Sequence, residues 1–117
     1  MSGDELRTLL EVLRREASER TEALASALRE LTHDRTGQSD DDEHDPEGVP
    51  LSAEWSRLSG LLDGAHDEQR QVDDALQRMD AGTYGVCVNC GRRIPAARLR
   101  VRPFAEHCVP CAEKLGR

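Results

Sequence analysis

Apolar residues recur at alternating spacings of four and three in the first third of the chain, between Leu6 and Leu31. The repeat is sustained over almost four heptads, and neither proline nor glycine interrupts it before Gly37. Such a repeat places its apolar positions along one narrow seam, so the pattern predicts a long helix over residues 4–33. Seven of the eight seam positions are apolar, and Arg20 can keep its charged head in water while its stem packs. The seam consists of Leu6, Leu10, Leu13, Ala17, Arg20, Leu24, Ala27 and Leu31.

A second stretch with the same repeat extends from Leu51 to Met79, and eight of its nine seam positions are apolar. Two seams of matching length joined by one loop predict an antiparallel helical hairpin. Pairing residues at equal distances from the loop places Arg20 near Leu62, and Trp55 is expected in the core near the loop end. The second seam consists of Leu51, Trp55, Leu58, Leu62, Ala65, Gln69, Val72, Leu76 and Met79.

The connection between the two predicted helices, at about residues 34–51, breaks both repeats with two glycines and two prolines. It also concentrates negative charge at what would be the tip of the hairpin. In an arbitrary protein such a loop is usually a solvated turn, although loops that carry function have the same composition. The acidic candidates for a functional tip are Asp41, Asp42, Glu43, Asp45 and Glu47.

The last third of the chain contains all four cysteines, arranged as Cys-Val-Asn-Cys and Cys-Val-Pro-Cys with seventeen residues between the two pairs. This spacing lets two tight loops bring four thiolates around one tetrahedral ion, which predicts zinc. Because sulfur fills every coordination position, no place is left for water or substrate, and the zinc should be structural. Redox dithiols, disulfides and an iron site are the weaker alternatives, and His107 is expected at the surface or beside the ligands. The predicted ligands are Cys87, Cys90, Cys108 and Cys111.

These patterns together predict a mainly α protein with two parts. Residues 1–80 would form a long antiparallel coiled-coil hairpin with an acidic tip. Residues 81–117 would form a small four-cysteine zinc finger that ends in a short helical turn, with Ile94, Leu99 and Phe104 as its core.

The formal charge of −7 hides a segregation along the chain. Residues 1–80 carry nine arginines against 21 acidic residues, a charge of −12, whereas residues 81–117 carry seven basic against two acidic residues, a charge of +5. The alternation of arginine with apolar residues after Ala97 predicts a strand or extended segment with one basic face, which would suit phosphates. An ordinary solvated face is an equally good interpretation. The candidates for this basic face are Arg92, Arg93, Arg98, Arg100 and Arg102.

Composition excludes several classes of protein. Only three residues are aromatic and a third are charged, which argues against a large globular core. No apolar run approaches the roughly 18 residues that span a membrane, so we expect a soluble, cytoplasmic protein whose thiols stay reduced. The sequence offers no nucleophile with a base partner, no open metal site and no phosphate-binding loop, so we do not expect an enzyme.

Residues 72–113 closely resemble the DksA/TraR C4-type zinc-finger family of bacteria, and the acidic-tipped hairpin resembles the architecture of that family. At the tip the family pattern D-x-x-D-x-A has its nearest match in residues 42–47, where Glu47 stands in place of the alanine. The matching motifs are Asp74-Ala75-Leu76, the run from Gly82 to Gly91, Ile94-Pro95, Arg98-Leu99, Arg102-Pro103 and Cys108-Val109-Pro110-Cys111.

The resemblance implies a regulator that binds RNA polymerase and inserts its hairpin through the secondary channel toward the catalytic magnesium, modulating initiation. It further implies a possible role for the alarmone ppGpp at that complex and no sequence-specific DNA binding, and we expect a monomer. The departure at Glu47 leaves the direction of regulation open. A zinc-dependent nucleic-acid-binding module would explain the basic finger alone, and a structural coiled-coil adaptor would explain the seams alone.

Overall fold

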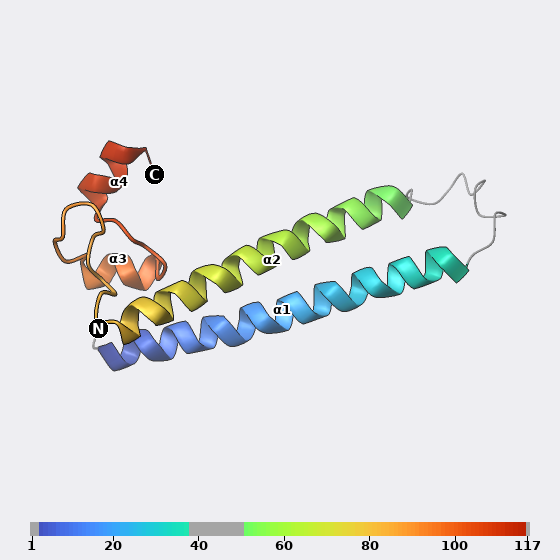
Figure 1. Cartoon of the computed structure of the whole chain (residues 1–117), viewed down its shortest axis with the longest axis horizontal. Helices are drawn as coiled ribbons and strands as arrows, with labels where there is room; N and C mark the ends of the chain where they lie inside the picture. Colours follow the sequence, from blue (N-terminus) through green and yellow to red (C-terminus); the bar gives the residue numbers. More distant parts are fainter. Residues whose placement is uncertain (1–2, 38–50, 117) are drawn as a thin grey trace. The chain divides into compact units, whose positions relative to one another are not determined.

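The computed structural model describes residues 3–37 and 51–116, which form four helices (Figure 1). Over these residues the only β pairing is an isolated antiparallel bridge between Val86 and Arg93. The prediction of a mainly α fold, with two long helices in contact followed by a small cysteine-rich module, is confirmed. None of the described helices combines the length and apolar character that crossing a bilayer requires. The helices are α1 (Gly3–Gly37), α2 (Leu51–Asp80), α3 (Ala96–Val101) and α4 (Val109–Leu115).

Contacts divide the chain into two compact units. One unit contains the part of α1 up to Arg15 together with everything from Gln69 onward, and the other contains Glu16–Glu68. Each unit therefore holds one stretch of α1 and one of α2, and the first unit also holds the whole cysteine-rich module. The predicted division into domains at residue 80 stays a prediction, which zinc removal would test.

The apolar seams account for the packing inside each unit. In the first unit Leu10 and Val72 are fully buried, and in the second Ala17 and Ala65 are buried. Arg20 is exposed, as expected for a charged residue that interrupts a seam. Because removing these apolar side chains from water contributes about 25 cal/mol per Å², the seams are the main stabilising feature of the long helices.

Three ion pairs between α1 and α2 define the register of the helices. Arg7 pairs with Asp80 at 2.7 Å, Arg14 pairs with Asp73 at 3.3 Å, and Arg20 pairs with Glu68. The predicted pairing of Arg20 with Leu62 is therefore wrong by about one and a half helical turns. The physical reason is that α1 continues to Gly37 instead of ending at residue 33, which moves the centre of the connection along the chain.

Trp55 does not occupy the core position expected for it. Its side chain is 42% exposed, and Leu61 on the same helix is also exposed. The observed register places Trp55 level with Thr32 and His33, which are polar and exposed. A correct seam position is thus not sufficient for burial.

Candidate metal centre

The first Cys-x-x-C pair lies in a tight turn that follows the end of α2. Cys87 N–H donates to the carbonyl of Arg92 at 2.8 Å, and Ile94 N–H donates to the carbonyl of Gly85 at 2.7 Å, on either side of the Val86–Arg93 bridge. Gly91 closes the turn by donating to the Cys87 carbonyl at 2.9 Å. Its φ of +76° lies in the left-handed region, where a side chain would add strain.

The second pair is held at the start of α4. Cys108 is the N-cap residue of this helix, and Pro110 lies in its first turn, where a missing N–H leaves no helical hydrogen bond unmade. Ala112 N–H donates to the carbonyl of Cys108 at 2.9 Å, so Cys111 is fixed one helical turn after Cys108. Gly116 ends α4 in the left-handed conformation typical of a C-cap.

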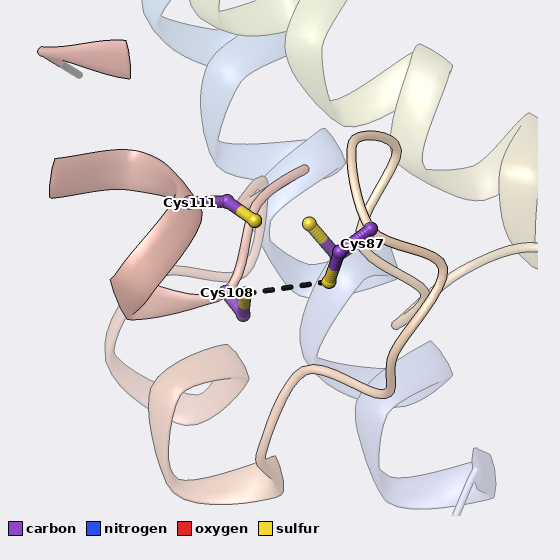
Figure 2. Close-up of side chains that lie close together, drawn as sticks. Cys87, Cys108 and Cys111 are labelled. Atoms are coloured by element: carbon purple, nitrogen blue, oxygen red, sulfur yellow. Dashed lines mark hydrogen bonds between the residues drawn. The ribbon is translucent and has the colours of Figure 1, made fainter. Parts of the chain in front are cut away.

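The two turns bring all four sulfurs together. Their Sγ atoms lie within 4.8 Å of one another, and those of Cys90 and Cys108 are 3.7 Å apart. A regular tetrahedron with Zn–S bonds of about 2.3 Å requires S···S distances of about 3.8 Å. Figure 2 shows Cys87, Cys108 and Cys111 directed toward a common point. The donor set fits one zinc ion in a closed structural site, as predicted, and leaves no open coordination position for catalysis.

Two of the thiols, those of Cys87 and Cys111, hold their protons unequally when no metal is bound. Burial acts to raise the pKa of Cys87, but the backbone amides of Cys90, Cys108 and Asn89 outweigh it and lower that pKa to about 5. The amide of Asn89 lowers the pKa of Cys111, yet hydrogen bonds with neighbouring thiols, together with burial, raise it to about 11. Four clustered thiolates therefore need a shared cation, which zinc supplies when bound.

The core under the metal site is not confined to the finger. Buried Leu6, from the first turns of α1, belongs to one cluster with Ile94, Leu99 and three of the four cysteines, and Met79 from α2 lies against the same cluster. Sequence reasoning assigned Leu6 to the helix seam only and missed this role. The sequence did contain a signal for this role. Leu6 is the first position of the first seam and Met79 is the last position of the second, so both lie at the end of the hairpin that adjoins the finger.

Two polar contacts hold the rest of the finger on this core. Tyr84 donates its hydroxyl to the carbonyl of Pro103 at 2.9 Å, and Arg78 pairs with Glu106 at 3.4 Å. Phe104, predicted as a core residue, is only half-buried. Ile94 and Leu99, the other two residues predicted for this core, are buried.

The extended basic segment predicted around Arg98–Arg102 is wrong, because residues 96–101 form helix α3. Residues two apart on a helix are separated by about 200°, so Arg98 and Arg100 lie on different sides. Arg98 is half-buried and donates its Nε to the carbonyl of His107 at 2.9 Å, whereas Arg100 and Arg102 are exposed. Arg92 and Arg93 are exposed in the first turn. The helix therefore does not place Arg98, Arg100 and Arg102 along one side, as an extended strand would.

The acidic tip candidates lie outside the described residues. Asp41, Asp42, Glu43, Asp45 and Glu47 all fall between the end of α1 and the start of α2. Their role stays a prediction from sequence.

Comparison with known proteins assigns the finger to a family. Residues 82–115 match the prokaryotic dksA/traR C4-type zinc finger, which confirms the resemblance inferred from the sequence. The chain is 32% identical over 93 residues to an uncharacterized protein of Aquifex aeolicus, covering 76% of this chain and 62% of that protein. It is 40% identical over 52 residues to the RNA polymerase-binding transcription factor DksA of Caulobacter vibrioides, covering 41% of this chain and 37% of that protein. The chain thus spans less than two thirds of the length of either relative.

The fold has a solved counterpart. The structure of transcription factor DksA2 from Pseudomonas aeruginosa matches with a TM-score of 0.79 and 26% sequence identity, covering 97% of this chain and 82% of that one. The similarity therefore includes both long helices as well as the finger.

Proposed function

We propose that this chain, whose finger belongs to the DksA/TraR C4-type zinc-finger family, is a transcription regulator that binds RNA polymerase in the bacterial cytoplasm. The observation that carries the proposal is the match of almost the entire chain to a transcription factor of this family. A lone zinc module or a lone coiled coil would match only part of such a structure. We propose that the chain acts as a monomer and without reading DNA sequence, since its acidic helices disfavour close contact with DNA phosphates.

In the proposed mechanism the hairpin enters the polymerase secondary channel and carries its acidic tip toward the catalytic magnesium. A 30-residue helix such as α2 is about 45 Å long, which suits a probe that must reach a recessed site. Carboxylates near the metal would interact with Mg²⁺ or its waters and repel nucleic-acid phosphate. The finger and the hairpin stem would provide binding, and the tip would change initiation.

The test replaces Asp42 and Asp45 together by Asn, which keeps side-chain size while removing charge. We expect polymerase binding to persist and the effect on transcription in vitro to fall strongly across several promoters. A matched control removes two charges elsewhere, with Glu11→Gln and Asp63→Asn on exposed helix positions. Equal transcriptional effects of the tip variant and the control would contradict the role of the tip, even if binding were intact.

The same samples separate this proposal from a nucleic-acid-binding module. Recovery of polymerase core subunits from cell extract by the wild-type chain is the expected result. If the chain instead retains nucleic acid, and loses it steeply as salt rises, phosphate contacts dominate and the polymerase proposal fails.

We further propose that any response to ppGpp arises at the complex and uses a cavity of about 390 Å³ that is lined by residues of the finger and by Gln71 of α2. Arg98, Arg102 and Phe104 line it, so it offers guanidinium groups for phosphates and a ring for a base. Arg102→Ala should abolish a ppGpp effect on transcription. Arg100→Ala is the control, because Arg100 is an exposed arginine of α3 two positions earlier and does not line the cavity. An unchanged ppGpp response in Arg102→Ala would remove this site from the mechanism.

A further inference from the structure

One side chain of the first cysteine turn reaches across to a ligand of the second. Asn89, the residue before Cys90, places its Nδ2 3.3 Å from the Sγ of Cys111, which lies 22 positions later in the chain. A metal-bound thiolate has no proton to donate, so the side-chain amide must be the donor. This contact is therefore an N–H···S hydrogen bond to a negatively charged acceptor.

The backbone beside Asn89 holds it in place for this contact. Val88 N–H donates to the carbonyl of Glu106 at 2.9 Å, which ties the first turn to the segment that leads into Cys108. The carboxylate of Glu106 in turn pairs with Arg78 on α2. Asn89 is thus presented to Cys111 by a backbone anchored on both sides of the metal site.

The donor to the Cys111 sulfur is a side chain and not a backbone amide. A single substitution at position 89 therefore removes this hydrogen bond and leaves the backbone of the turn in place.

We propose that Asn89 is a positioning residue of the zinc site, which holds the Cys111 thiolate on the metal and so sets how fast the second cysteine pair releases zinc. A zinc ion with four thiolates carries a net charge of about −2, and a hydrogen-bond donor aimed at one sulfur disperses part of that charge. Groups that support metal ligands in this way typically change metal affinity by about 10-fold to 100-fold when they are substituted.

The experiment measures zinc transfer from the full-length protein to a chromophoric chelator. Asn89→Ala should release zinc about 10-fold to 100-fold faster than wild type. Asn89→Asp should release it faster still, because a carboxylate beside a negative site adds repulsion. Asn89→Gln keeps the amide and should fall between wild type and Asn89→Ala. The matched control is Val88→Ala, an exposed neighbour in the same turn that contributes only its backbone N–H.

A spectroscopic measurement separates a hydrogen bond to sulfur from a general loosening of the turn. In the cobalt-substituted protein, loss of a donor raises the energy of the sulfur electrons, so the sulfur-to-cobalt charge-transfer band of Asn89→Ala should shift to lower energy. Circular dichroism checks that helix content is unchanged. Faster release without a band shift, or equal release rates for Asn89→Ala and Val88→Ala, would overturn the proposal.

Discussion

Substitution of Leu6 tests whether α1 stabilises the zinc site, because Leu6 is a residue of α1 whose side chain lies in the core of the finger. Its side chain is only 7% exposed and packs with Ile94, Leu99 and three of the four cysteines. If this packing stabilises the metal site, Leu6→Ala should weaken zinc binding although residue 6 lies 81 positions before the first ligand, Cys87.

The expected magnitude follows from the surroundings of Leu6. Leu→Ala substitutions in cores cost about 2–5 kcal/mol, and the larger values arise where a closed cavity is left. Leu6 lines an existing cavity of about 490 Å³ together with Met79 and Tyr84, so water can enter the space vacated. We therefore expect the low end, about 2 kcal/mol. Because zinc binding and folding of such a module are coupled, this corresponds to an apparent zinc affinity about 30-fold weaker.

The assay is competition for zinc against a chelator of known affinity, read beside helix content by circular dichroism. Leu24→Ala is the matched control, since Leu24 is a half-buried seam residue of α1 in the unit formed by Glu16–Glu68. That substitution should lower the melting temperature of the long helices and leave zinc affinity within about 2-fold. If Leu6→Ala and Leu24→Ala bind zinc equally well, the finger does not depend on α1, and our description of its core is wrong.

Four further predictions test other parts of the structure. Chelation of zinc should remove about a sixth of the helical circular dichroism signal, because α3 and α4 hold six and seven residues against 35 and 30 in α1 and α2; loss of most of the signal would mean that the hairpin cannot fold without the metal. Gly85→Ala should destabilise the finger by about 1–2 kcal/mol, since Gly85 has a φ of +82° and a Cβ there would lie 3.4 Å from Leu99. Gly64→Ala should instead stabilise the protein by about 0.5–1 kcal/mol and raise its melting temperature, because Gly64 is helical and a Cβ would meet open space; a stabilising Gly85→Ala or a destabilising Gly64→Ala would contradict the corresponding assignment. A double-mutant cycle on Arg20 and Glu68 should give a coupling of about 0.3–1 kcal/mol that falls as salt rises, whereas no coupling at low salt would argue against the observed register.

The sequence by itself determined the features that depend on short spacings. Seams at a 3-4 repeat specify which side of each long helix is buried, and Leu10, Ala17, Ala65 and Val72 are buried as the repeat requires. The cysteine spacing specifies a closed four-sulfur zinc site, because each pair needs only a local turn and two such turns supply the four ligands of one tetrahedral ion.

Tertiary structure decided what depends on which segments meet. The register of α1 against α2 follows from where α1 ends, and this left Trp55 exposed at a seam position. The segment in which arginines alternate with apolar residues forms helix α3, and Leu99 of this helix packs into the core. A pattern of five residues does not by itself determine whether such a segment becomes a strand or a helix. Leu6 in the core of the finger and Asn89 on Cys111 join residues far apart in the chain. Periodicity and motif spacing report only local geometry, so contacts of this kind emerge only when the chain is folded.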